Sequence, residues 1–211
     1  MDESLAVVPK ASPAMPICNL CGGKEFAPGP GGRLGKDGLG PRCVACGSLE
    51  RHRVSAQALQ ALHGADLDWR HALLVGPDRG ADPGWFRQCD ALQSPAPGSL
   101  PAALSGYGAG SIDFIGVAHV MEFLADDQDA FQRLMRLLSP RGILQICFSD
   151  PRMRPWTAIV PGPPGSLRRR YGRDLGRHFR CHERRIDMKM RESADPGTGD
   201  VLPVHFFYHQ R

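Results

Sequence analysis

Four cysteines in two close pairs constrain this chain more than any other feature. The pairs are Cys18 with Cys21 and Cys43 with Cys46; two residues separate the members of each pair, a glycine follows each pair, and 21 residues lie between the pairs. Two tight turns that each supply two thiolates form the tetrahedron that Zn2+ prefers. Because all four ligands come from protein, no position is left for a metal-bound water, and we expect a structural zinc ribbon. Disulfide bonds and a redox-active pair are the alternatives.

Length and composition allow a real core beside this ribbon. The chain has 211 residues, of which 42% are hydrophobic, so it suits one domain with a small appendage. No apolar stretch approaches the ~18 residues of a membrane span, and the N-terminus lacks the basic start and apolar core of a signal peptide. We therefore expect a cytoplasmic protein without a membrane span. We divide it into a disordered tail (1–16), a zinc ribbon (17–53) and a main domain (54–211).

The basic charge of the chain is concentrated near its C-terminal end. Between Arg152 and Arg191 stand twelve lysines and arginines against three acids. Such a surface can bind a phosphate-bearing partner, or it can be a solvated face with local ion pairs. Guanidinium groups bind phosphate and carboxylate with two parallel hydrogen bonds, so we predict that an anionic substrate contacts this region. In a group-transfer reaction this substrate would be the acceptor of the group. The predicted acceptor-binding residues are Arg168, Arg169, Arg170, Tyr171 and Arg173. Because few aromatic residues are interleaved, a small or glycan-type phosphorylated acceptor is favoured over nucleic acid.

Hydrophobic periodicity in the main domain predicts alternating helices and strands. Helices are expected over 48–64 and from Asp126 or Asp127 onward, and strands over 72–75, 112–117, 143–148 and 201–209. Short connections between strand, helix and strand give a right-handed crossover, which predicts an open α/β sheet. Pro203 makes the last strand an edge strand or an antiparallel one.

Ligands of such sheets bind beyond the carboxyl ends of the strands. The segments at these ends are 76–80, Asp90, 118–122 and 149–150. His119 follows a predicted strand directly, where it could act as a general base or simply pack and hydrogen-bond. Glu122 could orient His119 or cap the helical turn that follows, and we favour the capping role.

The order of these motifs resembles bacterial class I S-adenosylmethionine-dependent methyltransferases that carry an N-terminal zinc ribbon. The resemblance rests on CxxCG, CxxCGSLERHR, a strand followed by GPDRG, SIDFIGVAHVMEFL, LLSPRGIL and RRRYGRDL, and it extends over about residues 18–179. It implies a Rossmann-like, mostly parallel sheet whose last strand is antiparallel, with S-adenosylmethionine (SAM) as methyl donor and structural Zn2+. By the same resemblance, the donor-binding residues are Gly76, Pro77, Gly80, Asp90, Ala118 and His119, with Asp90 on the ribose hydroxyls.

Three departures from the family pattern weaken the match to the family's donor-binding motif. Leu74 replaces an acid that the family has two residues before its first glycine, and Asp90 follows Gly76 by only 14 positions. The stretch 94–110, where the family has its third strand, is rich in proline and glycine. Two interpretations stay open: a methyltransferase with an eroded donor motif, or an inactive zinc-ribbon adaptor that binds a partner through its basic C-terminal surface. Direct nucleic-acid binding is a third.

Overall fold

The computed structural model describes residues 16–36, 38–76, 80–92, 100–163 and 165–210. The predicted tail, residues 1–16, therefore lies almost wholly outside the described residues. In the part of the chain that is described, no helix is both long and apolar enough to cross a membrane. The longest of them, α1, has 14 residues.

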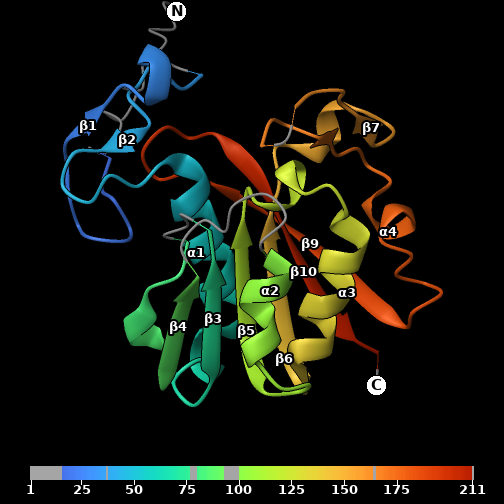
Figure 1. Ribbon diagram of the computed structural model, residues 1–211. Helices are drawn as coiled ribbons and strands as arrows, with labels where there is room; N and C mark the ends of the chain where they lie inside the picture. The colour runs from blue at the N-terminus through green and yellow to red at the C-terminus, as the bar shows by residue number, and fades with distance from the viewer. Residues whose placement is uncertain (1–15, 37, 77–79, 93–99, 164, 211) are drawn as a thin grey trace, which may run out of the picture.

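A six-stranded sheet forms the centre of the main domain, with its strands in the order β4-β3-β5-β6-β10-β9. The strands are β3 (His71–Val75), β4 (Gln88–Leu92), β5 (Ile112–Ala118), β6 (Leu138–Cys147), β9 (Ile186–Ala194) and β10 (Val201–His209). The first four are parallel to one another, whereas β10 runs antiparallel to both β6 and β9 (Figure 1). The predicted α/β fold, mostly parallel with an antiparallel last strand, is confirmed.

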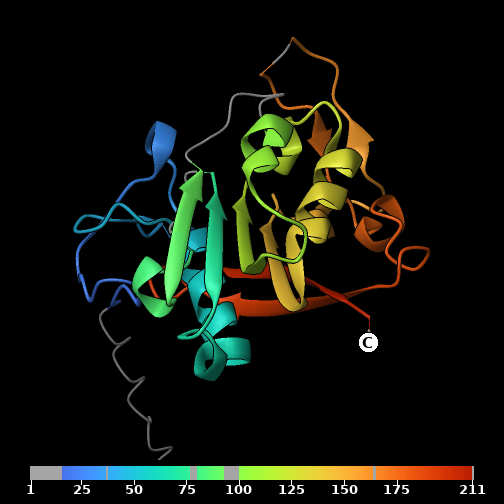
Figure 2. The ribbon, with the colours of Figure 1, turned by 60° about the horizontal axis from the view of Figure 1, so that its bottom comes forward.

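Helices cover both faces of the sheet (Figure 2). The helices are α1 (Glu50–His63), α2 (Leu100–Ala103), α3 (Asp127–Leu137) and α4 (Leu175–His178). On one face, Leu59 of α1 belongs to a buried cluster with Leu74 and Phe206. On the other, Phe131 of α3 belongs to a cluster with Leu73. This alternation of neighbouring strand residues between two cores is the reason that β3 is a continuous apolar run.

The predicted connection from helix to strand is confirmed at α3 and β6. Asp126 caps α3 by accepting a hydrogen bond from the backbone N–H of Asp129 at 2.8 Å. The helix ends at Leu137, and β6 begins at once rather than at residue 143 as expected. Pairing of this early part of β6 with β5 requires a register shift between Ile112 and Phe114.

The last strand, β10, is antiparallel as predicted, but it is not the edge of the sheet. The edge is β9, which pairs with all of β10. Pro203 is tolerated because β6 pairs with β10 only at residues 205–207. At Pro203 one side of β10 therefore has no neighbouring strand, and the missing N–H breaks no hydrogen bond there.

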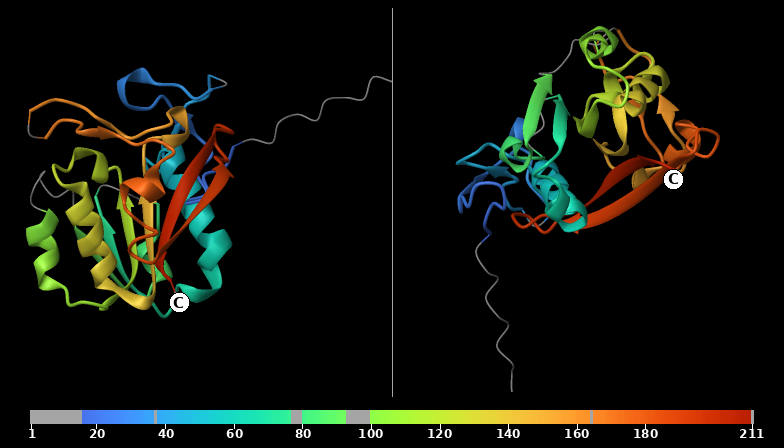
Figure 3. Two further views of the ribbon diagram at one scale, coloured as in Figure 1. Left: turned by 90° about the vertical axis from the view of Figure 1, so that its right-hand side faces the viewer. Right: turned by 90° about the horizontal axis from the view of Figure 1, so that it is seen from below.

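Two small antiparallel hairpins lie at the end of the sheet where the parallel strands finish (Figures 1 and 3). The first, β1 (Phe26–Ala27) with β2 (Arg42–Cys43), belongs to the predicted zinc ribbon. The second, β7 (Ala158–Ile159) with β8 (Arg169–Arg170), was not predicted. The predicted boundary between residues 53 and 54 falls inside α1, so ribbon and main domain share this helix.

Candidate functional site

The four predicted metal-ligating cysteines lie together. Their sulfur atoms are all within 4.8 Å of one another, with 3.8 Å between Cys18 and Cys46 and 3.6 Å between Cys21 and Cys43. A tetrahedral ion with bonds of about 2.3 Å holds its sulfur ligands about 3.8 Å apart. The glycine after each pair has a φ of 73° or 71°, a conformation that glycine adopts without strain. The cluster therefore fits a four-coordinate metal ion.

A buried ion pair joins this ribbon to the sheet. Arg53 of α1 contacts Asp195, which lies between β9 and β10, through Nε–Oδ1 and Nη2–Oδ2 distances of 2.6 and 2.8 Å. Both side chains are completely buried. The same guanidinium donates to the carbonyls of Ser48 and Pro41 in the ribbon and lies 5.0 Å from the centre of the Phe26 ring. Arg53 thus holds the ribbon and the β9–β10 turn together.

The turn after β3 lies directly against the segment that follows β5. Gly76 has a φ of 98°, and its N–H donates to the carbonyl of Leu92 at 3.0 Å. A Cβ atom on Gly76 would lie 2.7 Å from Cγ2 of Val120 and 3.0 Å from the carbonyl oxygen of Ala118. Only glycine fits here, both for its backbone conformation and for this close approach.

The other residues predicted to bind the donor are placed as follows. Pro77 lies outside the described residues, and Gly80 is buried. Asp90 lies opposite Leu73 in the middle of β4, two residues before that strand ends. Its Oδ2 atom is 3.0 Å from Nε2 of His71, and its side chain is 35% exposed. The ribose-binding role of Asp90 stays a prediction.

His119 lies in a strained turn at the end of β5, next to a buried acid. Its φ is 49°, and its N–H donates to the carbonyl of Cys147 at 3.1 Å. Its Nδ1 atom is 3.5 Å from Oε1 of Glu122. That oxygen accepts a hydrogen bond from the backbone N–H of Ser149 at 2.8 Å. The expected capping role of Glu122 is therefore wrong, because its buried carboxylate connects the ends of β5 and β6.

A cavity of about 390 Å³ opens beside His119. Its walls come from the ribbon, the first turns of α1, the ends of β5 and β6, and the start of β10. Arg33 of the ribbon pairs with Glu50 of α1 in this wall. Among the described residues, Oε2 of Glu50, Nε of Arg51 and Nε2 of His119 are buried without a hydrogen-bond partner. The volume suits a small molecule.

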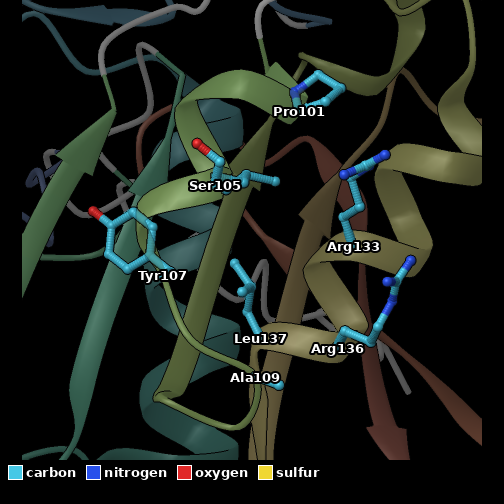
Figure 4. A pocket seen from close by; sticks show the side chains of 8 residues that line it. Pro101, Ser105, Tyr107, Ala109, Arg133, Arg136 and Leu137 are labelled. Atoms are coloured by element: carbon cyan, nitrogen blue, oxygen red, sulfur yellow. The ribbon is translucent and has the colours of Figure 1, made fainter.

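A smaller cavity between α2 and α3 suits a ligand less well (Figure 4). Tyr107 and Ser105 line one side, and Arg133 and Arg136 of α3 line the other. Its volume is about 190 Å³, below the range of about 300 to 1,000 Å³ that is usual for ligand pockets. Of these two cavities, the one beside His119 is therefore the better candidate site.

Comparisons with known proteins show which fold this chain has. No family model and no curated protein matches the sequence. A Burkholderia thailandensis 1,6-didemethyltoxoflavin-N1-methyltransferase, crystallised with 1,6-didemethyltoxoflavin and S-adenosylhomocysteine, matches the structure with a TM-score of 0.50 and 17% identity, over 76% of this chain and 79% of that one. This chain has the class I methyltransferase fold. A SAM-dependent methyltransferase from Thermotoga maritima matches at 0.48 and 14% identity, over 76% and 92% of the chains.

Two of the residues predicted to bind the acceptor instead make contacts with other parts of the protein. Arg169 donates to the carbonyls of Leu124 and Ala125 at 2.6 and 2.9 Å, and its Nε lies 3.0 Å from Oδ1 of Asp127. The Tyr171 side chain is 1% exposed, and its hydroxyl donates to Oδ2 of Asp127 at 2.7 Å. Both side chains hold the β7–β8 hairpin against the start of α3.

The three other predicted acceptor-binding residues lie nearer the surface. Arg168 is half-buried and donates to the carbonyl of Gly162. Arg173 is exposed and donates from Nε to the carbonyl of Arg152 at 3.1 Å. Arg170 is exposed in β8. The structure therefore separates the predicted cluster into a buried group around Asp127 and a surface group.

Asp127 is a central residue that sequence reasoning missed. It is 1% exposed and accepts from Tyr171, with His178 Nε2 at 2.7 Å from the same oxygen. Burial by itself would raise the pKa of Asp127, but the hydrogen bonds of His178 and Tyr171 outweigh burial and hold this pKa below its ordinary value. Tyr171 and His178 lie 44 and 51 residues away in sequence, so no local pattern could have revealed the group.

We expect Asp127→Asn to lower the free energy of unfolding by about 3 kcal/mol at neutral pH, because it leaves Arg169 without its buried partner charge. Since the folded-state pKa lies below the unfolded one, the carboxylate stabilises the fold above about pH 4, and this contribution is lost as the pH falls through the folded-state value. Urea unfolding at several pH values measures both effects. Equal stability of variant and wild type at neutral pH would contradict the prediction.

Proposed function

We propose that this chain transfers a methyl group from SAM to a small acceptor. The observation that carries the proposal is the contact between Gly76 and residues 118–120, where backbone from two strand ends meets at the ligand-binding edge of a class I methyltransferase fold. The Burkholderia enzyme, which shares this fold, was crystallised with S-adenosylhomocysteine, the compound that SAM becomes after methyl transfer.

The proposed donor site lies at the ends of β3 and β5 and beside the middle of β4. We assign donor binding to Gly76, Pro77, Gly80, Asp90, Ala118 and His119. The missing side chain at Gly76 lets the turn after β3 pack directly against Ala118 and Val120, and the partly exposed carboxylate of Asp90 can accept hydrogen bonds from two ribose hydroxyls. Asp90 would share its carboxylate between the ribose and His71.

His119 is the proposed general base. When bound, SAM would supply an electrophilic methyl group for the acceptor nitrogen or oxygen and would leave as S-adenosylhomocysteine. His119 takes the proton that the acceptor loses, at Nε2, which has no partner among the described residues. Glu122, at 3.5 Å from Nδ1, stabilises the imidazolium that results.

The proposed acceptor is a small or glycan-type molecule that carries an anionic group. Arg168, Arg170 and Arg173 are its proposed partners because they lie nearest the surface. If nucleic acid is the acceptor instead, its affinity will fall steeply as salt rises. We propose Zn2+ as the ion in the cysteine cluster, with a structural role, and the cytoplasm as the compartment that keeps its thiols reduced.

Isothermal titration of the zinc-loaded chain with SAM and S-adenosylhomocysteine tests the proposal. We expect micromolar affinity for both, and an affinity lowered by about 10- to 100-fold in Asp90→Ala through loss of charged hydrogen bonds. His71→Asn is the matched control, because it breaks the same His71–Asp90 contact and keeps the carboxylate. It should retain near wild-type affinity. No binding of either compound up to millimolar concentration, in a folded protein, would contradict methyl transfer and favour the adaptor.

A further inference from the structure

One face of the β9–β10 strand pair is only partly covered by other side chains. Met188 lies opposite Phe207 and Met190 opposite His205, so these four side chains share the face that α3 and α4 also occupy. Phe207 is fully buried beneath Phe131 of α3. Met188 and Met190, by contrast, are 37% and 51% exposed. The covering layer therefore ends partway along β9.

The uncovered part of this face is the floor of a cavity of about 460 Å³. Its apolar wall consists of Met188, Met190, Leu175 and Pro151. The volume lies in the range of small-molecule pockets. Methionine side chains are flexible and polarisable, so they adapt to flat or branched apolar groups. The cavity suits a compact apolar body.

The rim of this cavity carries one positive charge that has no acid beside it. Arg152 is not available to an anion, since its guanidinium contacts the carboxylates of Asp150 and Glu192, each at 2.6 Å, and these two negative charges outweigh its own. Arg173 contacts only the carbonyl of Arg152, and no acid among the described residues pairs with it. A ligand with an anionic group can therefore supply the carboxylate or sulfonate that Arg173 lacks.

His205 adds polarity without charge at the base of the same cavity. Its side chain is buried, and burial, which Arg152 reinforces and Asp150 opposes, lowers its pKa to about 4. At neutral pH the ring is therefore uncharged, and it packs edge-on against Phe148 with 5.5 Å between ring centres. Among the described residues that line this cavity, Arg173 is the one cation whose guanidinium contacts no carboxylate.

We propose that this cavity binds a small amphipathic anion, with an aromatic or branched apolar body against Met188 and Met190 and a carboxylate or sulfonate on Arg173. None of Gly76, Asp90 and His119 lines it. The proposal concerns binding alone. It shares Arg173 with the proposed acceptor site but none of the donor-binding residues, and it holds whether or not the chain binds SAM.

Titration of the full, zinc-loaded chain with 8-anilinonaphthalene-1-sulfonate, in the absence of SAM, tests the proposal. We expect a saturable rise in fluorescence with one site per chain. Met190→Glu should weaken binding by about tenfold or more, because it removes apolar contact and adds a like charge. Arg173→Gln should weaken binding several-fold and remove most of its salt dependence. The matched control is Met153→Glu, at a methionine that is 76% exposed and outside the cavity. It should leave the affinity unchanged.

Competition between the dye and a pair of naphthalene compounds tests whether the ligand needs a negative charge. We expect 1-naphthoate to displace the dye and the uncharged 1-naphthylmethanol to do so much more weakly. Equal losses in Met190→Glu and Met153→Glu, a signal that does not saturate, or equal displacement by both naphthalenes would each overturn the proposal. Thermal unfolding of each variant shows whether it is folded. If Met190→Glu is unfolded, the affinity of Arg173→Gln for the dye alone tests the proposal, because Arg173 is exposed.

Discussion

Replacing Cys43 with serine is expected to abolish metal binding and to unfold the ribbon. The Cys43 side chain is fully buried, and its sulfur is 3.6 Å from that of Cys21 within a cluster that spans less than 4.8 Å. Three thiolates and a hydroxyl hold Zn2+ far more weakly than four thiolates. Structural zinc contributes about 10 to 16 kcal/mol of apparent binding free energy in small zinc domains, so its loss leaves this glycine-rich segment too little buried surface to stay folded.

Elemental analysis should find one zinc ion per wild-type chain and none in Cys43→Ser. Limited proteolysis should cut the variant between residues 17 and 48 under conditions that leave the wild type intact. Cys89→Ser is the control, because this half-buried thiol lies outside the cluster, and it should keep its zinc. A wild-type chain without zinc, or a variant with full metal content, would contradict the assignment.

Asp195→Asn is expected to lower the free energy of unfolding by about 3 to 5 kcal/mol, because it leaves the buried guanidinium of Arg53 without its counter-charge. For a chain of this size, this loss corresponds to a melting temperature lower by about 10 °C. The asparagine keeps the shape of the side chain, but it removes the charge and replaces one accepting oxygen with an NH2 group. Asp195 also accepts hydrogen bonds from the N–H groups of Gly197 and Thr198, so the β9–β10 turn should loosen as well.

Asp129→Asn is the matched control for this experiment. Asp129 pairs with Arg133 one helical turn away, but both side chains are exposed, at 38% and 44%. Exposed pairs of this kind contribute less than about 1 kcal/mol. Urea unfolding of both variants should therefore show a large loss for Asp195→Asn and almost none for Asp129→Asn. Similar values for the two would mean that the Arg53–Asp195 pair does not anchor the ribbon.

Most elements of the fold could be predicted from local patterns. The strands at 72–75 and 112–117 and the helix that starts at Asp127 agree with β3, β5 and α3 within one or two residues. These predictions rest on the spacing of apolar residues that are close in sequence, so they do not depend on contacts between distant parts of the chain. The β7–β8 hairpin was missed because each strand has only two residues and follows no such pattern.

The sequence alone determined the metal cluster and the glycine turn, since each depends on residues a few positions apart. Only the tertiary structure decided what the charged residues do. Arg53 and Asp195 are 142 positions apart, yet they form a fully buried pair. Arg169 forms an ion pair with Asp127, whereas Arg173 lies at the rim of a cavity and pairs with no acid among the described residues. The reason is physical: whether a charge is neutralised depends on distance and burial, and local sequence specifies neither for partners so far apart.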